Sequence, residues 1–302
     1  MSIKVENVSK FYGNQAALDD VSFSIGKSQI VGFLGPNGAG KSTMMKILTS
    51  FIPASKGNVE VCDLNVETHS NQIKQLVGYL PEHNPLYLDM YVKEYLAFVA
   101  SIHKVKNKKD RIAEMIELVG LEREQKKKIG ALSKGYRQRV GLAQAIIHDP
   151  EVLILDEPTT GLDPNQLVEI RNLIVEVGKT KTVMLSTHIM QEVEAICDRV
   201  ILIDNGRIKA DDSISNIQKS SGKGQVVYVE FDTDISDKVL KSIKGVGNTR
   251  RLHGNTWLIE SKDEQDIRKD ISKAAQKEDN VILTMRIEEM SMEEVFKKLT
   301  KK

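Results

Sequence analysis

The feature of this sequence that most constrains its fold is a short apolar run that breaks into a glycine-rich loop. The run covers residues 30–34, long enough for one buried strand, and the loop continues as Gly-Pro-Asn-Gly-Ala-Gly-Lys-Ser-Thr over residues 35–43. Glycine adopts backbone conformations that a side chain would block, so such a loop can turn several N–H groups inward. Residues 43–48 supply the following helix, whose positive end would face the same loop. The stretch therefore predicts a strand, a phosphate-binding loop and a helix in succession.

The side chains that close the loop suit phosphate and a metal ion. Lys41 is placed to reach the outer phosphates of a bound nucleotide, and Ser42 offers a hydroxyl to Mg²⁺. A glycine-rich turn with no ligand is the alternative interpretation. The spacing G-x-x-x-x-G-K-[ST] between a predicted strand and a predicted helix favours nucleotide binding.

The charge balance gives no general footprint for nucleic acid. The 302 residues include 43 Lys and Arg against 42 Asp and Glu, so we expect no nucleic-acid partner. Two local basic runs, residues 103–109 and 126–128, are candidates for contact with anionic lipid or a partner protein. A solvated surface is the favoured interpretation of both runs.

Cysteine usage and hydropathy bear on the compartment. Cys62 and Cys197 lie far apart and lack metal-ligand spacing, which predicts a reduced, cytosolic protein. No uninterrupted apolar segment approaches the roughly twenty residues that span a bilayer, and residues 1–6 do not resemble a signal peptide. Any membrane association is therefore expected to be peripheral.

A second apolar strand ends in two carboxylates. Residues 152–155 are continuously apolar, as in a central parallel strand covered on both faces, and Asp156 and Glu157 follow directly. Ligands gather at the carboxyl ends of such strands. Asp156 is thus a candidate for holding Mg²⁺, and Glu157 for polarising a water that attacks the γ-phosphate. A strand followed by a polar turn is the alternative, which the preceding phosphate loop disfavours.

Three further residues are candidates by position. His188 follows the predicted strand 182–187 and is placed to contact the γ-phosphate, although a lone histidine is more often structural. Ser133 is placed to cap a helix that runs through residue 147, a role that needs no ligand. Tyr12 lies between two predicted antiparallel strands, residues 3–8 and 21–25, where it would either stack on a purine or pack as an ordinary tyrosine.

The rest of the chain divides by pattern. Residues 83–130 carry apolar residues at helical spacing over 91–102 and 111–119, which predicts a helical insertion. Residues 219–224 are predicted as a linker that ends a first domain at residue 218. Residues 225–302 then follow the order strand, helix, strand, strand, helix, strand, which is the ferredoxin-like order. A capping box, Ser291 with Glu294, opens a final helix.

Together these stretches resemble the ATP-binding subunit of ABC transporters over roughly residues 1–215. The resemblance rests on five motifs in fixed order: an aromatic at Tyr12, a Walker A loop over residues 35–43, a signature over residues 133–135, a Walker B strand ending at Glu157, and a switch histidine at His188. Residues 160–163 are similar to the D-loop. The flanks most resemble the exporter branch, in particular the gliding-motility-associated ATPases.

The resemblance implies a fold class: an α/β P-loop ATPase core with an antiparallel β-flap and a helical insertion, followed by a small ferredoxin-like α+β domain. It also implies ATP and Mg²⁺ as ligands. The residues expected to contact ATP are Tyr12, Gly35, Pro36, Asn37, Gly38, Ala39, Gly40, Lys41, Ser42, Thr43, Ser133, Gly135 and Asp163. Those expected at the metal are Ser42, Glu82 and Asp156, and the catalytic pair is Glu157 and His188.

Two positions depart from the family pattern. The signature usually reads L-S-G-G-Q, and here Lys134 and Tyr136 replace its third and fifth residues, while Ser133 and Gly135 are kept. Glu82 stands where a glutamine is commonest. A carboxylate there can still contact Mg²⁺ or its water, but it adds negative charge beside the phosphates.

The same resemblance implies an assembly. Two identical chains are expected to pair head to tail with two ATP molecules between them, and to act on integral membrane permease subunits at the inner face of the cell membrane. A nucleotide-dependent clamp or regulatory ABC protein without transport is the alternative. A ribosome-acting ABC protein usually carries two cassettes, and a related DNA-repair ATPase would need a long coiled coil between Lys41 and Ser133, so both are disfavoured.

Overall fold

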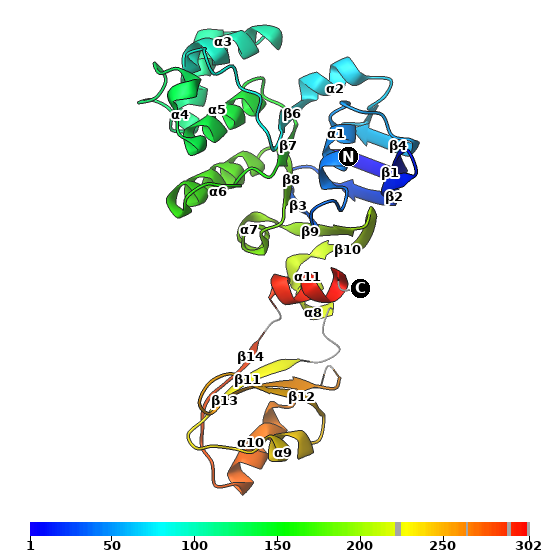
Figure 1. Cartoon of the computed structure of the whole chain (residues 1–302), viewed down its shortest axis with the longest axis vertical. Helices are drawn as coiled ribbons and strands as arrows, with labels where there is room; N and C mark the ends of the chain where they lie inside the picture. The colour runs from blue at the N-terminus through cyan, green and yellow to red at the C-terminus, as the bar shows by residue number, and fades with distance from the viewer. Residues whose placement is uncertain (221–224, 264, 289–290, 301–302) are drawn as a thin grey trace. The chain divides into compact units, whose positions relative to one another are not determined.

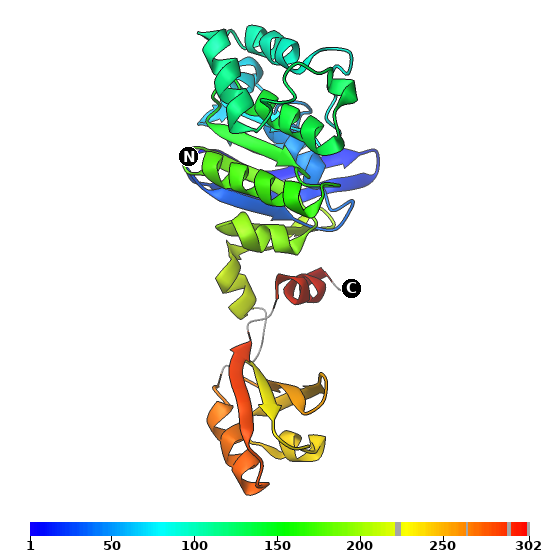
Figure 2. The ribbon, with the colours of Figure 1, turned by 90° about the vertical axis from the view of Figure 1, so that its left-hand side faces the viewer.

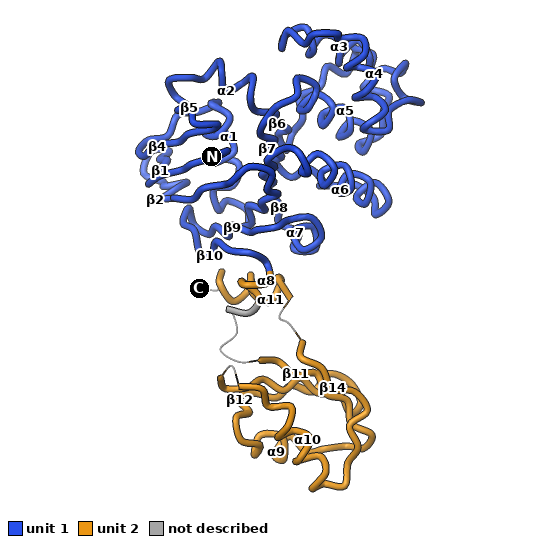
Figure 3. The backbone as a smooth tube through the Cα atoms, turned by 180° about the vertical axis from the view of Figure 1, so that it is seen from behind, with its two compact units in different colours: residues 1–214 blue, residues 215–302 orange. Residues whose placement is uncertain are grey.

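The computed structural model describes residues 1–220, 225–263, 265–288 and 291–300. It divides the chain into two compact units, residues 1–214 and 215–302 (Figure 3). Each unit has its own secondary structure and its own buried apolar residues, and the two are described separately.

The first unit contains a small antiparallel sheet. Its strand order is β2-β1-β4-β5. The strands are β1 (Ile3–Tyr12), β2 (Gln15–Ile25), β4 (Lys56–Val61) and β5 (Leu64–Asn65). The predicted antiparallel flap is thereby confirmed, although both of its first strands extend further toward the intervening turn than the apolar pattern indicated.

A six-stranded sheet forms the centre of the first unit (Figure 1). Its order is β10-β9-β3-β8-β7-β6, with all pairs parallel except β10 with β9. The strands are β3 (Ile30–Leu34), β6 (Val77–Leu80), β7 (Val152–Asp156), β8 (Thr182–Thr187), β9 (Arg199–Asp204) and β10 (Arg207–Ser213). Strand β7 pairs on both sides, as predicted for a continuously apolar run.

The two faces of this sheet are buried in different apolar clusters. Leu153 and Leu155 of β7 belong to one cluster, whereas Val152 and Ile154 belong to the other. Side chains alternate across a strand, so a run that is apolar at every position fills both clusters at once. The sheet is therefore covered on both faces, and its strands end side by side at one edge.

Helices cover both faces. Helix α1 (Lys41–Leu48) packs with the flap through Met44, Met45, Ile47 and Leu48. The other helices of this unit are α2 (Ser70–Leu76), α3 (Val92–Ile102), α4 (Lys108–Leu118), α5 (Lys134–Ile146), α6 (Pro164–Gly178) and α7 (Met190–Ile196), with a short 3₁₀ turn η1 (Ile129–Ala131) before α5. Helix α8 (Ile214–Ser220) follows β10.

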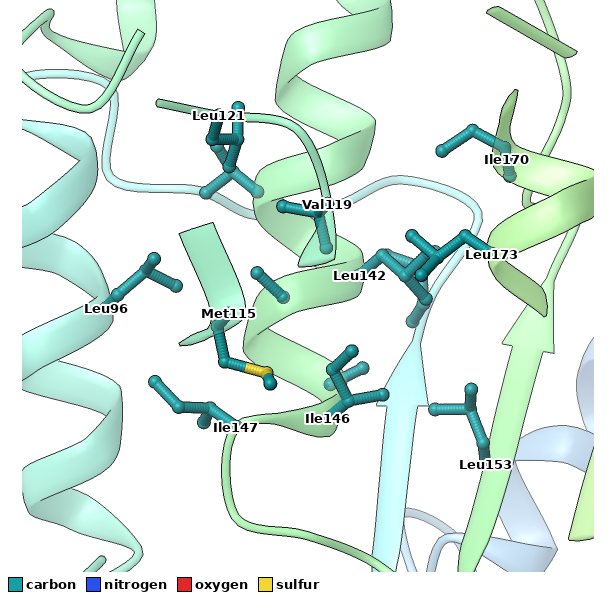
Figure 4. Packing of buried hydrophobic residues seen from close by; sticks show 14 of the residues in the cluster. Leu96, Met115, Val119, Leu121, Leu142, Ile146, Ile147, Leu153, Ile170 and Leu173 are labelled. Carbon is teal, nitrogen blue, oxygen red and sulfur yellow. The ribbon is translucent and has the colours of Figure 1, made fainter. Parts of the chain in front are cut away.

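The predicted helical insertion is confirmed as α3 and α4, which pack on α5. Figure 4 shows this packing: Leu96 of α3 and Met115 of α4 lie on one side of α5, and Leu142 of α5 lies beside Leu173 of α6 on the other. All four side chains are buried. The insertion is therefore part of the same apolar cluster as the α5 and α6 face of the central sheet.

The second unit has the predicted ferredoxin-like order. Its elements are β11 (Val226–Phe231), α9 (Asp237–Ser242), β12 (Val246–Arg251), β13 (Thr256–Ser261), α10 (Arg268–Lys277), β14 (Ile282–Glu288) and α11 (Met292–Thr300). The sheet runs β12-β13-β11-β14 and every pair is antiparallel. Helices α9 and α10 both contribute to the apolar cluster on one face of this sheet (Figure 2).

At the ends of this unit, the predicted capping box is confirmed, whereas the predicted linker is partly wrong. Ser291 Oγ accepts a hydrogen bond from the Glu294 N–H at 3.3 Å, and Glu294 Oε2 accepts one from the Ser291 N–H, so the capping box is formed. The predicted linker over residues 219–224 is wrong in its first two residues, which are helical because α8 continues to Ser220. Residues 221–224 lie outside the described residues, and the division falls after residue 214 rather than 218.

Candidate functional site

The glycine-rich loop joins β3 to α1, and its geometry requires glycine at particular positions. Gly38 and Gly40 have φ of +79° and +109°, in the region that side chains disfavour. A Cβ on Gly40 would lie 2.5 Å from the Ala17 carbonyl oxygen, and one on Gly35 would lie 2.3 Å from that of Ile203. The loop is thus packed against β2 and β9, and larger residues at Gly35 or Gly40 would displace it.

A cavity of about 340 Å³ opens over this loop. Its lining comes from the loop and α1, from β2, and from the segments after β6, β7 and β8. The residues are Gln15, Ala17, Asn37, Gly38, Gly40, Lys41, Ser42, Thr43, Glu82, Glu157, Thr160 and His188. Helix α1 begins in this wall with no side-chain cap and no acidic residue in its first turn. Uncapped N–H groups and the positive end of the helix suit the phosphates of a nucleotide.

Lys41 is the main cation in the cavity wall. Its ammonium donates hydrogen bonds to the Gly35 carbonyl at 2.8 Å and the Pro36 carbonyl at 3.2 Å, and it lies 3.9 Å from Oε1 of Glu157. Burial lowers the pKa of Lys41, and the carboxylates of Glu157, Asp156 and Glu82 oppose that shift. The side chain is 7% exposed, so the backbone carbonyls fix a nearly buried ammonium at the floor of the cavity.

The two carboxylates after β7 have different surroundings. Asp156 is 2% exposed, and Oδ1 accepts a hydrogen bond from the Ser186 hydroxyl on β8. Glu157 has a φ of +51°, and its N–H donates to the Ser186 carbonyl at 3.2 Å and the Ser186 Oγ at 3.1 Å. The turn that follows β7 therefore directs the Glu157 side chain into the cavity, whereas Asp156 remains beneath it.

Two neighbours hold the Glu157 carboxylate. The Thr160 hydroxyl donates to Oε2 at 3.0 Å. His188 Nδ1 lies 2.9 Å from Oε2 and 3.0 Å from Oε1, which places the ring on the same carboxylate. The predicted pair Glu157 and His188, from the ends of two adjacent strands, is thus brought into contact at the cavity. The Glu157 carboxylate is therefore fixed in orientation at the edge of the cavity.

Oxygen donors suited to magnesium lie at the same place. Ser42 and Glu82 line the cavity, and Asp156 lies at the end of β7 beside it. Magnesium prefers hydroxyl, carboxylate and water oxygens, so this donor set fits that ion. The carboxylates of Asp156 and Glu82 also raise the pKa of the Tyr79 hydroxyl, after burial, which places both carboxylates near one point of β6.

Other residues predicted for the nucleotide lie outside this wall. Ser133 caps α5 by accepting a hydrogen bond from the Tyr136 N–H, and Asp163 caps α6 by accepting from the N–H groups of Asn165 and Gln166. A Cβ on Gly135 would lie 2.2 Å from the Gln166 side chain, so α5 and α6 meet there. Of the described residues that line the cavity, none comes from either helix.

The two signature residues that depart from the family pattern, Lys134 and Tyr136, and the aromatic residue Tyr12 each contact neighbours outside the cavity. Lys134 Nζ lies beside Gly161, where a Cβ would be 2.1 Å away. Tyr136 is partly buried against the apolar cluster that the insertion shares with α5 and α6, and the Arg139 guanidinium lies 5.7 Å from the centre of its ring. Tyr12 is 52% exposed at the end of β1, under the Lys10 ammonium, and is absent from the described cavity wall.

Sequence reasoning missed four contributors. Gln15 and Ala17 line the cavity from β2, a strand that gave no chemical signal. Thr160 was assigned only to the D-loop, and Ser186 only to a strand, yet both bond to the carboxylates after β7. The only indication for Ser186 in the sequence was its hydroxyl near the end of an apolar strand.

Comparison with known proteins agrees with this geometry. Residues 18–160 match the sequence model of the family described as ABC transporter. The bacitracin transport ATP-binding protein BcrA of Bacillus licheniformis is 35% identical over 240 residues, covering 79% of this chain and 77% of that protein. The linearmycin resistance ATP-binding protein LnrL of Bacillus subtilis (strain 168) is 31% identical over 314 residues, covering 99% and 98%.

Solved structures give the same result for the fold. The dimeric structure of MJ0796, a bacterial ABC transporter cassette, superposes with a TM-score of 0.65 at 26% identity, covering 70% of this chain and 98% of that one. The fold and the site define a P-loop ATPase. The chain belongs to the ATP-binding subunits of ABC transporters, a family of enzymes that bind and hydrolyse ATP.

Proposed function

We propose that two copies of this chain close head to tail over two ATP molecules and that this cycle drives an exporter-type ABC transporter. The main support is the composition of the cavity wall, which includes Lys41, Glu157 and His188. The signature residues Ser133 and Gly135 lie instead at the start of α5, outside this wall. A site divided in this way is completed by the signature of a second chain.

The residues of the cavity divide the work of hydrolysis. Lys41 and the N–H groups at the start of α1 bind the outer phosphates. Glu157 orients the attacking water and accepts its proton, and His188 holds that carboxylate in place while facing the γ-phosphate. Mg²⁺, held by Ser42, Asp156 and Glu82, would neutralise charge on the phosphates. Tyr12 stays a prediction as the residue that stacks on adenine.

The start of α5 suits the γ-phosphate of a partner's ATP. Ser133 caps the helix, no acidic residue occupies its first turn, and the side chain of Lys134 is exposed there. The positive end of the helix therefore favours an approaching anion. Asp163, at the start of α6 beside this surface, is proposed to link the two halves of the dimer. ATP then favours the closed dimer, and hydrolysis releases it.

A mixing experiment tests the divided site. Lys41→Ala removes the phosphate lysine, and Ser133→Arg blocks the signature, so each variant alone should hydrolyse ATP at no more than about a hundredth of the wild-type rate. In the mixed dimer one site keeps both an intact loop and an intact signature. We expect phosphate release to recover to roughly a quarter of the wild-type rate in an equal mixture, because about half of random dimers are mixed and each has one intact site of two.

The outcomes separate the competing functions. Recovery on mixing supports the head-to-tail dimer, whereas no recovery with either variant contradicts it. Dimers of the wild type that form on ATP but release no phosphate would favour the clamp without turnover. Co-purification of an untagged Lys41→Ala chain with a tagged Ser133→Arg chain in the presence of ATP serves as the control for subunit exchange.

The surface of the insertion is proposed to receive the membrane subunits. Tyr87, Tyr91 and Phe98 are 55%, 48% and 41% exposed, and the Tyr87 and Phe98 rings lie 5.7 Å apart. Exposed aromatic clusters of this kind are typical of protein contacts. The segment from Glu82, in the cavity wall, to Tyr91 runs directly into this cluster. Tyr87→Ser should therefore weaken co-purification with membrane subunits while leaving basal ATP hydrolysis unchanged.

The same proposal concerns where the chain acts and which kind of transporter it belongs to. Among the helices of the described residues, none is both long and apolar enough to cross a bilayer. We place the chain at the cytoplasmic face of the membrane, held there by permease subunits. The two relatives described above are named for bacitracin transport and linearmycin resistance, so they lend no support to the narrower gliding-motility assignment, which stays a prediction. Identification of the subunits that co-purify from membranes tests the membrane location and the gliding-motility assignment together.

A further inference from the structure

A buried carboxylate near the site has no part in the chemistry described so far. Glu192 lies on α7 and is 0% exposed. Its Oε2 accepts a hydrogen bond from the Thr187 hydroxyl at 2.8 Å, while its Oε1 is buried without a hydrogen-bond partner among the described residues. A half-satisfied buried carboxylate costs stability, so its presence calls for a functional reason.

Glu192 bonds to the hydroxyl of Thr187, the residue that precedes His188. Thr187, the last residue of β8, is itself 0% exposed and pairs with Leu34 immediately before the glycine-rich loop. The Thr187 Oγ1 also accepts a hydrogen bond from the Ile189 N–H at 3.0 Å. The hydroxyl is thus held between Glu192 and the residue after His188, and the histidine is the middle residue of a clamped tripeptide.

The helix that carries Glu192 is anchored to the central sheet. A Cβ added to Gly32 of β3 would lie 3.1 Å from the Cys197 sulfur and 3.3 Å from Val193 Cγ1. The glycine therefore lets α7 and its end approach the strand closely. Because α7 is fixed against β3, the bond from Glu192 ties the clamped tripeptide to the strand that leads into the phosphate loop.

His188 differs sharply from its flanking residue in exposure. Its side chain is 49% exposed, yet Nδ1 lies 2.9 Å from Glu157 Oε2. An exposed imidazole on a strand end has several rotamers, and losing them costs free energy unless the backbone is already set. The hydrogen bonds of Thr187 to Glu192 and to the Ile189 N–H set that backbone in advance.

We infer that Glu192, acting through Thr187, is a positioning residue that holds His188 against Glu157 for ATP hydrolysis. This inference rests on the catalytic roles proposed above for Glu157 and His188. It assigns Glu192 no contact with ATP. Its loss should therefore lower kcat and leave KM for ATP nearly unchanged.

The test uses the full chain with Mg²⁺ and ATP. Glu192→Met keeps the volume but removes the acceptor, and Glu192→Gln keeps an acceptor for the Thr187 hydroxyl. We expect Glu192→Met to lower kcat by about tenfold or more with KM within about twofold, and Glu192→Gln to stay within about twofold of wild type. Glu192→Met removes a half-paired buried carboxylate but also leaves the buried Thr187 hydroxyl without its acceptor, so the two effects on stability oppose each other and thermal melting is measured to confirm that the variant folds.

A double-mutant cycle with His188→Ala separates positioning from general damage. If Glu192 acts through His188, Glu192→Met should cause no further loss of kcat in the His188→Ala chain, whereas a merely structural role gives a further, multiplicative loss. Should Glu192→Met fail to fold, Thr187→Val with Thr187→Ser as its conservative partner carries the same comparison.

Each outcome has one meaning. Wild-type kcat in both Glu192→Met and Thr187→Val overturns the inference, as does a multiplicative loss in the cycle. Wild-type kcat in His188→Ala instead removes the proposed role of the histidine, and with it the basis for the inference. Loss of kcat in His188→Ala with full activity in both Glu192→Met and Thr187→Val leaves the proposed function standing and rejects only the positioning role.

Discussion

His188 Nδ1 lies 2.9 Å from Glu157 Oε2, although the two residues are 31 positions apart in the chain. Their contact follows from the pairing of β7 with β8, because each residue comes just after its strand. Glu157 reaches it from a left-handed backbone conformation with a φ of +51°. Such a conformation costs about 1 kcal/mol or more in a non-glycine residue, and it aims the carboxylate at the ring and at Lys41.

The first prediction concerns the acid itself. Glu157→Gln keeps the shape of the side chain and its bond to Thr160 but removes the base, so ATP binding should persist while phosphate release falls by about a hundredfold or more. The variant should also stay dimeric with ATP, which size-exclusion chromatography reports. Glu151→Gln, at the exposed start of the same strand, is the matched control. A Glu157→Gln chain that turns over at the wild-type rate excludes Glu157 from the catalytic role.

The second prediction separates binding from stability at Lys41. Lys41→Met removes a nearly buried ammonium whose pKa is lowered by burial, and this gain opposes the loss of its bonds to the Gly35 and Pro36 carbonyls, so the fold should stay close to wild type in stability. Nucleotide affinity should fall by about tenfold or more, because the outer phosphates lose their cation. Titration with a fluorescent ATP analogue and thermal melting measure the two effects. Lys46→Met, on the exposed face of the same helix, should leave affinity unchanged.

Runs of apolar sequence gave the clearest predictions of the fold. Strand β3 begins and ends at the predicted residues, since a fully apolar run between Gln29 and Gly35 has only one way to be buried. Strands β1 and β2 extend beyond their predicted ends to Tyr12 and Gln15, because ladder hydrogen bonds hold polar, exposed residues there. The apolar pattern does not report such bonds.

The site divides in the same way. Lys41 was predicted because it closes the glycine-rich loop, and Glu157 and His188 were predicted because each follows an apolar strand. The bonds from Thr160 and Ser186 depend on how a turn and two strands meet, which no local pattern encodes. The absence of Tyr12 from the described wall depends likewise on the path of the first hairpin.

The third prediction contrasts two glycines of the loop. Gly38→Ala meets no atom within 4 Å, so it should cost only the left-handed backbone penalty of about 1 kcal/mol. Gly40→Ala carries the same penalty and also places Cβ 2.5 Å from the Ala17 carbonyl oxygen, so it should destabilise by about 2 kcal/mol more. Urea unfolding measures both. Equal destabilisation of the two variants would show that β2 yields freely to the loop.

A pair of stacked histidines on the insertion side gives a prediction about pH. The His103 and His148 rings lie 4.0 Å apart, and His148 Nε2 lies 3.2 Å from the Val77 carbonyl oxygen. Burial, followed by the neighbouring His103, lowers the pKa of His148 from 6.5 to about 4. The neutral ring, with Nε2 as donor, is therefore the form that the fold selects.

The fourth prediction follows from the sign of that shift. The unfolded chain binds the His148 proton below pH 6.5, whereas the folded chain resists it until about pH 4. The free energy of unfolding should hence be greatest above pH 6.5 and fall through this window by on the order of 2 kcal/mol, allowing for partial solvent exposure. His148→Gln keeps a donor for Val77 and should flatten this slope in urea unfolding between pH 7 and 4.5. His69→Gln, at an exposed position, is the control for the substitution itself, and an equal slope in the wild type and His148→Gln would refute the assignment.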